Sequence, residues 1–413
     1  MPAELNIPTR LETPKGLRIH IGLFGRRNAG KSSLINALTN QQIAIVSDVP
    51  GTTTDPVEKA CELAPVGPVV FIDTAGIDDV GKLGHLRTDR TMSVLGWMDL
   101  ALIVCDAAGI TDYEKELFRI VTANKTPAIV VLNKTDLHAP EAPVISTIKS
   151  FNLPFVSVSA SEHIGIDTLL SAIIRTIQEE TEPDRPMMEG LISPGDTVLM
   201  VTPIDTGAPK GRMILPQVQA IRETLDSDAL CLTVRENRVA QAISQQTVPP
   251  KFVITDSQVF AKVSADTPAD IMLTSFSILF ARYKGNLPAL IKGVPALEQI
   301  EDGDKILVSE GCTHHRQCDD IGTVKIPRWL KEYTGKELII ETSSGTEFPD
   351  DLGSYKMIIH CGGCMLNERE MQFRQYSAEE KGVPYTNYGI LIAYINGILK
   401  RSLAPFDEYA SMI

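Results

Sequence analysis

The chain has 413 residues, of which 43% are hydrophobic and 22% charged, and its net charge is −13. This composition excludes disordered, collagen-like and coiled-coil proteins. No apolar stretch approaches the ~18 residues of a membrane span, residues 1–16 show no secretory signal, and an acidic surface disfavours nucleic acid. We therefore expect a cytoplasmic protein of two or three domains, without membrane or nucleic-acid partners.

Residues 17–180, within a first domain predicted over residues 1–180, alternate short apolar runs with amphipathic stretches. We predict strands over Leu17–Phe24, Val69–Asp73, Leu100–Asp106, Ala128–Asn133 and Phe155–Ser159, and helices over Lys31–Thr39, Asp112–Ala123 and Ile166–Gln178. This alternation indicates βαβ units, and therefore an α/β domain with a doubly wound, mostly parallel sheet. The charged, proline-containing segment Glu179–Pro186 is predicted to be a linker.

The alternation continues beyond the linker. Strands are predicted over Thr197–Thr202, Ala229–Val234 and Phe252–Thr255, before a break at Ser264–Asp270. After the break we expect helices near Ser275–Tyr283 and Leu287–Ala296, and strands over Lys305–Ser309, Glu337–Glu341 and Lys356–His360. The sequence thus predicts two further α/β domains, residues 187–265 and 266–413.

A phosphate-loop pattern, GxxxxGK[ST], runs from Gly25 to Ser32 between a predicted strand and a predicted helix. Its glycines let backbone N–H groups surround phosphate oxygens at the helix N-terminus. Lys31 should reach the β- and γ-phosphates, and the Ser32 hydroxyl should bind Mg²⁺.

Two later motifs complete a nucleotide site. In Asp73-Thr-Ala-Gly76, the carboxylate should hold Mg²⁺ through water and the Gly76 N–H should sense the γ-phosphate. In Asn133-Lys-Thr-Asp136, the last carboxylate can accept two hydrogen bonds from guanine, a donor pair that adenine lacks. The catalytic candidates are Lys31, Asp73 and Gly76. The full predicted site comprises Gly25, Asn28, Ala29, Gly30, Lys31, Ser32, Ser33, Thr53 as a second Mg²⁺ ligand, Asp73, Gly76, Asn133, Lys134, Asp136, and Ser159 with Ala160 over the base.

Residues 17–180 resemble the translation-factor class of GTPases, in the subgroup that contains Era, Der and the tRNA-modification GTPase TrmE. Ile77 follows the Asp73–Gly76 motif where the Ras class carries a catalytic glutamine, so another group must assist hydrolysis. Asn28 stands at the position that helps to hold K⁺ in potassium-dependent members. The resemblance implies a GTPase that converts GTP to GDP and phosphate and is stimulated by K⁺.

Cysteine motifs follow two strands of the last predicted domain. Cys312-Thr-His314 and His360-Cys361-Gly-Gly-Cys364 should converge at the carboxyl edge of one sheet. Three thiolates with histidine nearby fit either Zn²⁺ or an iron–sulfur cluster, and a redox pair is a further interpretation of the CxxC. His314 and His360 are candidates for a fourth ligand, or for orienting a ligand.

The combination of both sites, together with Ile326–Leu330, resembles the HydF family of [FeFe]-hydrogenase maturation GTPases over the whole chain. That resemblance implies a [4Fe–4S] cluster held by Cys312, Cys361 and Cys364, and a homodimer formed by the middle domain. It also implies a scaffold that receives a di-iron precursor made with the radical-SAM partners HydE and HydG and delivers it to the apo-hydrogenase. A ribosome- or tRNA-associated GTPase, a GTP-regulated zinc enzyme and a non-catalytic nucleotide switch are the alternatives.

Overall fold

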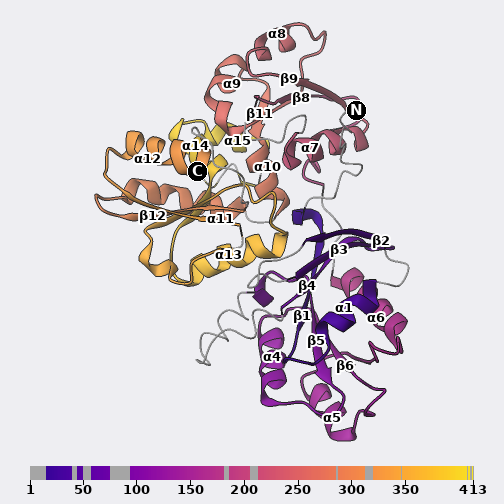
Figure 1. The fold of residues 1–413 in the computed structure, drawn as a ribbon. Coiled ribbons are helices and arrows are strands. Elements are labelled where there is room, and N and C mark those ends of the chain that lie inside the picture. The colour runs from indigo at the N-terminus through magenta and orange to yellow at the C-terminus, as the bar shows by residue number, and fades with distance from the viewer. Residues whose placement is uncertain are drawn as a thin grey trace, which may run out of the picture. The chain divides into compact units, whose positions relative to one another are not determined.

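The computed structural model describes residues 15–39, 44–49, 57–74, 94–180, 186–204, 213–284, 287–311, 320–345, 347–406, 408–409 and 412. They fall into two compact units, residues 1–183 and 184–413 (Figure 1). Among the described residues, no helix is both long enough and apolar enough to cross a membrane.

A seven-stranded sheet forms the centre of the first unit. Its strands are β1 (Ile19–Phe24), β2 (Ala44–Val49), β3 (Val57–Leu63), β4 (Gly67–Asp73), β5 (Leu100–Asp106), β6 (Ala128–Asn133) and β7 (Phe155–Ser157). They are ordered β2-β3-β4-β1-β5-β6-β7, and only the β2–β3 and β3–β4 pairs are antiparallel. The predicted α/β domain with a doubly wound, mostly parallel sheet is confirmed.

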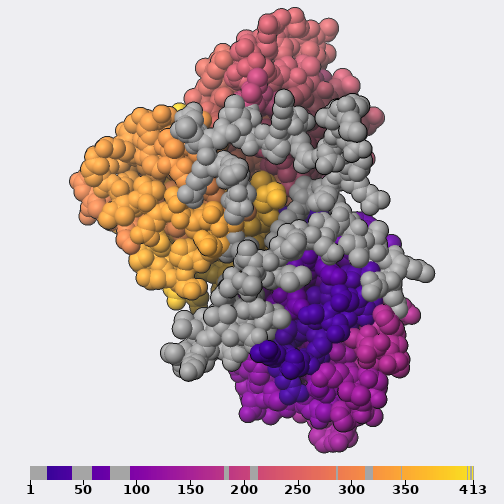
Figure 2. All heavy atoms as spheres, in the orientation of Figure 1, coloured from indigo at the N-terminus to yellow at the C-terminus, as the bar shows by residue number. Residues whose placement is uncertain are grey.

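Helices cover both faces of this sheet. The helices α1 (Lys31–Thr39) and α6 (Ile166–Glu180) share a core with one face, whereas α4 (Asp112–Ala123) and α5 (Ala142–Ser150) share a core with the other. Successive residues of β5 alternate between the cores: Leu102 lies in the first and Ile103 in the second. The sequence of a strand that is buried on both faces is therefore an unbroken run of apolar residues. In the space-filling view, the indigo and magenta parts of this unit pack into one body (Figure 2).

The second unit contains two parallel sheets of four strands. The first is ordered β11-β10-β8-β9, from β8 (Thr197–Val201), β9 (Leu230–Val234), β10 (Phe252–Thr255) and β11 (Met272–Ser275). The second is ordered β13-β12-β14-β15, from β12 (Lys305–Glu310), β13 (Ile339–Ser344), β14 (Met357–His360) and β15 (Tyr385–Asn387).

One hydrophobic core runs through the whole second unit, from Met187 to Phe406. The first sheet extends past residue 265, because β11 pairs with β10. The division into domains at residues 265 and 266 stays a prediction.

The helices of this unit connect and cover the two sheets. They are α7 (Leu215–Asp226), α8 (Val239–Ser244), α9 (Phe260–Asp266), α10 (Phe276–Tyr283), α11 (Leu287–Gly293), α12 (Ile326–Thr334), α13 (Glu368–Glu380), α14 (Tyr388–Ile395) and α15 (Leu399–Leu403), and a π-helical turn, Ile321–Lys325, precedes α12. The side chain of Ser275 accepts a hydrogen bond from the Ile278 N–H and so caps α10. The end of α10 places Lys284 beside the cysteine loop.

Candidate functional site

The phosphate loop joins β1 to α1 and depends on two glycines. Gly25 has φ +144°, and a Cβ there would lie 2.2 Å from the carbonyl oxygen of Val104. Gly30 has φ +92°, and its Cβ would lie 2.3 Å from Nδ2 of Asn133. Both positions combine a left-handed backbone with a close neighbour, so only glycine fits.

The reactive side chains of the loop point inward and toward β4. The Lys31 ammonium is buried and donates hydrogen bonds to the carbonyl oxygens of Gly25 and Arg26, the latter at 3.3 Å. Ser32 Oγ donates to Asp73 Oδ2 at 2.6 Å. Two of the predicted groups around Mg²⁺ therefore lie together, and both present the hard oxygen atoms that this ion prefers.

The predicted guanine-binding motifs converge at the ends of β6 and β7. Asn133 is buried, and its Nδ2 donates to the Ala29 carbonyl at 2.9 Å while its Oδ1 accepts from the Ala160 N–H at 3.1 Å. Ser159 Oγ donates to Asp136 Oδ1 at 2.6 Å. One asparagine thus ties the phosphate loop to the loop expected over the base.

Lys134 follows Asn133 and turns toward β5. Its ammonium donates to Asp106 Oδ2 at 2.8 Å. Burial alone would raise the pKa of Asp106, but the hydrogen bond and charge of Lys134 outweigh it and hold that pKa below its ordinary value. Asn28, with φ +64°, and Ser33 are exposed on the loop and the first turn of α1. Thr53, Gly76 and Ile77 lie outside the described residues.

Sequence reasoning missed a buried carboxylate beside the phosphate loop. Glu114 is fully buried, its Oε1 lies 3.4 Å from Nε of Arg26, and its Oε2 accepts a hydrogen bond from the Thr111 N–H at 2.9 Å. The signal was present as a capping pattern, a threonine followed three residues later by glutamate at the start of α4. The pattern alone does not show that the same glutamate meets an arginine of the phosphate loop.

The cysteine loop lies at the carboxyl edge of the second sheet of the second unit. β12 and β14 are neighbours, with Ser309 opposite His360. Each strand leads directly into one cysteine motif, and the Gly311 N–H donates to Cys361 Sγ at 3.1 Å. The Gly363 N–H donates to the same sulfur at 3.3 Å. Gly311, which precedes Cys312 in the chain, therefore lies beside Cys361.

The thiols of Cys361 and Cys364 are partly buried. Burial first, and then the neighbouring Cys364, raise the pKa of the Cys361 thiol to about 11. Burial also raises the pKa of Cys364, although the charge of Lys284 opposes this effect. A bound metal would displace these protons, and two N–H groups already point at one sulfur. The residues present therefore fit a thiolate-ligated metal group.

Cys312 and His314 lie outside the described residues. Among the residues that the structure does describe, no group of three or more cysteine, histidine or acidic side chains is arranged to hold a metal ion. The described cysteines of the first unit, Cys61 and Cys105, are buried in β3 and β5.

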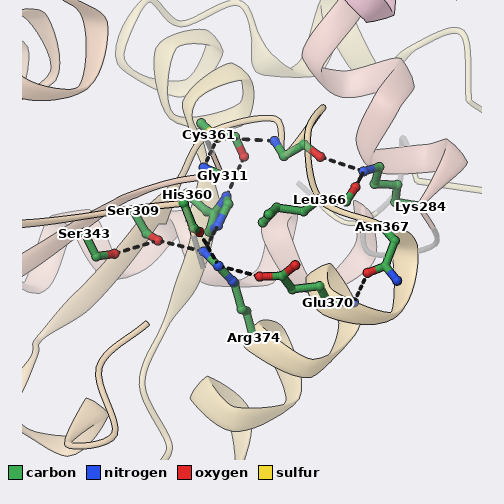
Figure 3. Close-up of polar contacts among 12 residues, drawn as sticks. Lys284, Ser309, Gly311, Ser343, His360, Cys361, Leu366, Asn367, Glu370 and Arg374 are labelled. Atoms are coloured by element: carbon green, nitrogen blue, oxygen red, sulfur yellow. Dashed lines mark hydrogen bonds and ion pairs between the residues drawn. The ribbon is translucent and has the colours of Figure 1, made fainter. Parts of the chain in front are cut away.

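His360 is fully buried at the end of β14, and both of its ring nitrogens have partners (Figure 3). Nδ1 lies 2.8 Å from the Cys361 carbonyl oxygen, and Nε2 lies 3.0 Å from Nη1 of Arg374. Because a guanidinium can only donate, Nε2 must accept and Nδ1 must carry the hydrogen that bonds the carbonyl. Burial first, and then the charge of Arg374, lower the pKa of His360 to about 3. The ring is neutral and fully engaged within the protein.

Arg374 is the centre of a buried polar network under the cysteine loop (Figure 3). Its Nη2 donates to Glu370 Oε1 at 2.6 Å and to the Gly345 carbonyl at 2.7 Å. Its Nη1 also donates to Ser309 Oγ, at 3.3 Å. No motif marks this arginine, and the only signal in the sequence is the Glu370–Arg374 spacing of four residues on one helix, which is common on exposed faces.

The remaining cation of the site is Lys284, which is also buried. Its ammonium donates to the carbonyl oxygens of Gly363 and Leu366, on either side of Cys364 (Figure 3). Burial lowers its pKa to about 8, against the opposing charges of Cys364 and Cys361. No motif in the sequence marks this lysine.

The fold and the site of the first unit define a P-loop GTPase domain, and residues 20–134 match the family model described as "50S ribosome-binding GTPase". The chain is 37% identical over 171 residues to the tRNA modification GTPase MnmE of Picosynechococcus sp., and 35% identical over 177 residues to GTPase Der of Wolinella succinogenes. These matches cover 39% and 40% of this chain, and 35% and 37% of the relatives. The chain thus spans little more than a third of the length of these relatives.

Crystallised Era of Aquifex aeolicus, bound to GDP and aluminium fluoride, is 22% identical to this chain with a TM-score of 0.32, over 52% of this chain and 92% of its own. The second unit is matched by two models of one family. Residues 187–285 match the hydrogen maturase F dimerization domain, and residues 288–405 match the hydrogen maturase F tetramerization domain. Together these two models account for more than half of the chain. The chain belongs to the hydrogen maturase F family.

Proposed function

We propose that this chain is a GTP-hydrolysing scaffold that binds a [4Fe–4S] cluster and a di-iron precursor and delivers the precursor to [FeFe]-hydrogenase. One observation carries the proposal: the Gly311 N–H donates to Cys361 Sγ, so the two strands that lead into the two cysteine motifs end side by side. The same chain carries a phosphate loop tied to a guanine-binding motif through Asn133. The di-iron precursor and the hydrogenase are inferred from the resemblance of the chain to the HydF family.

Different residues of the first unit bind the phosphates, the metal ions and the base of GTP. Lys31 and the loop N–H groups bind the phosphates, while Ser32 and Asp73 hold Mg²⁺ together with Thr53. Asp136 reads the guanine edge, and Ser159 fixes the orientation of that carboxylate. Asn28 helps to hold K⁺, whose charge takes the place of an arginine finger.

Cys361, Cys364 and Cys312 would hold the iron–sulfur cluster, in agreement with the sulfur donors at this edge of the sheet. When bound, the cluster supplies an iron with an exchangeable fourth position at which the precursor docks. Of the two roles considered for His360, we assign the positioning role, because both ring nitrogens are engaged. Its Nδ1–H holds the Cys361 carbonyl, and Arg374 fixes the tautomer.

The proposed partners follow from the family: a second copy of the chain, the radical-SAM maturases HydE and HydG, and the apo-hydrogenase. GTP hydrolysis would then govern when the scaffold holds or releases a partner.

Anaerobic reconstitution of the full chain with ferrous iron and sulfide tests the central part of the proposal. We expect the wild type to turn brown and to give the EPR signal of a reduced [4Fe–4S] cluster. Cys361→Ser, Cys364→Ser and Cys312→Ser should each lose the signal, because a hydroxyl does not replace a thiolate at iron. Cys231→Ser, on β9 of the other sheet, is the matched control and should keep it.

Metal analysis separates the main alternative. A wild type that takes up zinc, stays colourless and binds neither iron nor sulfide would contradict the cluster and leave a GTP-regulated zinc protein.

A further inference from the structure

The ammonium of Lys284 lies against the cysteine loop. It follows α10 directly and only 2% of its surface is exposed. Its Nζ lies 2.6 Å from the Gly363 carbonyl oxygen and 2.5 Å from that of Leu366. The carbonyl oxygen one residue before Cys364 and the carbonyl oxygen two residues after it thus bind one ammonium, which closes the loop around this cysteine.

The ammonium is bound by two backbone carbonyl oxygens. Among the described residues, no carboxylate forms an ion pair with Lys284. Arg374, the other buried cation of the site, differs because Glu370 lies 2.6 Å away. A buried charge without a counter-charge is costly. When deprotonated, Cys364 and Cys361 act most strongly on the charge of Lys284, followed by the carboxylates of Glu368 and Glu370.

A cluster held by thiolates would supply the missing negative charge. Each coordinated cysteine is deprotonated, and added electrons make the group more negative. A fixed ammonium beside it then stabilises the bound cluster, and stabilises the reduced form most. The contact between the Lys284 side chain and the Phe280 ring, 5.2 Å from Nζ to the ring centroid, holds the ammonium in this position.

We propose that Lys284 is a positioning residue that closes the Cys361–Cys364 loop and serves as the counter-charge of the bound iron–sulfur group. The proposal deepens the proposed function and rests on it, because it requires that the loop bind a cluster. Lys284 ligates no iron in this scheme. It acts through the two carbonyl oxygens that it holds and through its charge.

The test compares the full chain with Lys284→Met, Lys284→Arg and Lys292→Met after anaerobic reconstitution. Lys284→Met keeps the length of the side chain but removes the charge and the donors. We expect it to retain iron about 10- to 100-fold less tightly in competition with a chelator. The cluster that remains should have a more negative reduction potential in an EPR-monitored titration.

Lys284→Arg keeps the positive charge but changes the geometry of the hydrogen bonds to the two carbonyl oxygens. It should retain iron less tightly, because a planar guanidinium does not match the two carbonyl oxygens, but should keep the wild-type potential. Lys292→Met removes an exposed charge from α11 and should behave as wild type in both measurements.

Outcomes that overturn the proposal differ from those that overturn the function. A wild type that binds no iron and sulfide contradicts the proposed function. A wild type that binds the cluster, with a Lys284→Met variant of equal iron retention and equal potential, contradicts the role of Lys284 alone. If circular dichroism shows that Lys284→Met does not fold, the potential of Lys284→Gln decides: a negative shift supports the role of the charge, and a wild-type value overturns it.

Discussion

Single side chains connect loops that are far apart in the sequence. The Asn133 amide contacts the phosphate loop through Ala29 and the base loop through Ala160, so two segments 131 residues apart share one buried donor–acceptor group. Asp136 is held in turn by Ser159. The affinity for nucleotide therefore depends on the orientation of these polar groups as well as on their identity.

A change at Asp136 tests this nucleotide site. Asp136→Asn replaces a carboxylate that accepts two hydrogen bonds from guanine with an amide that accepts only one, and we expect GTP binding to weaken by about 3 kcal/mol. Xanthosine triphosphate, which presents a carbonyl in place of the 2-amino group, should bind this variant better than GTP does. Isothermal titration measures both affinities, and the second ligand shows that the variant is folded.

The rate of GTP hydrolysis tests the role of K⁺. Turnover of GTP by the wild type should be faster in KCl than in NaCl, and Asn28→Ala should remove most of the difference without abolishing binding. Equal wild-type rates in the two salts would contradict the role of K⁺.

Motifs revealed some residues of the two sites and left others hidden, for a physical reason. Lys31, Ser32, Asp73 and Asn133 lie beside strand ends in patterns that phosphate and metal chemistry require, and the structure brings them together. Lys284 has no such pattern. Its burial depends on the packing of α10 against a loop some 80 positions later in the chain, and a single sequence read locally predicts an exposed lysine.

At the scale of elements, the apolar pattern found the strands that are buried on both faces. Leu100–Asp106 and Ala128–Asn133 were predicted with the bounds that β5 and β6 have. The pattern missed β2, β3, β11 and β15. Three charged residues interrupt β3, and β11 has only four residues next to a polar segment, so neither forms a long apolar run. Expected strand Glu337–Glu341 is shifted by two to three residues from β13.

One close contact between elements gives a sharp stability prediction. The last residue of α11 is Gly293, and a Cβ there would lie 2.1 Å from the Tyr385 carbonyl oxygen of β15. Gly293→Ala must push the helix away from the strand, and we expect it to lower the free energy of unfolding by about 3 kcal/mol. Urea denaturation followed by Trp329 fluorescence, in a Trp97→Phe background that leaves one tryptophan, measures the change.

Gly335, after α12, is the matched control. It has φ +67° but no atom within 4 Å of a Cβ, so Gly335→Ala carries only the backbone cost of about 1 kcal/mol. If the two variants unfold at the same urea concentration, the close contact between α11 and β15 does not lower the stability of Gly293→Ala.

At the scale of the whole molecule, the chain carries the dimerization and tetramerization domains of its family. The first sheet of the second unit has exposed apolar residues near its β9 edge. β9 stands at one end of its strand order, and its first residue, Leu230, is 63% exposed. Val218 and Leu225, seven positions apart on one side of α7, are also exposed, and α7 packs against β9.

These three apolar residues favour a homodimer through the segment predicted to form one, residues 187–265. In a two-fold interface each substitution occurs twice, so Leu230→Lys would introduce two like charges into one apolar contact. We expect Leu230→Lys to halve the mass of the assembly in sedimentation velocity, from dimer to monomer or from tetramer to dimer. Leu137→Lys is the control, because Leu137 is 66% exposed in the GTPase unit and should leave the mass unchanged. A wild-type chain that sediments as a monomer at micromolar concentration would contradict the dimer itself. An unchanged mass for Leu230→Lys, with an oligomeric wild type, would move the interface away from β9.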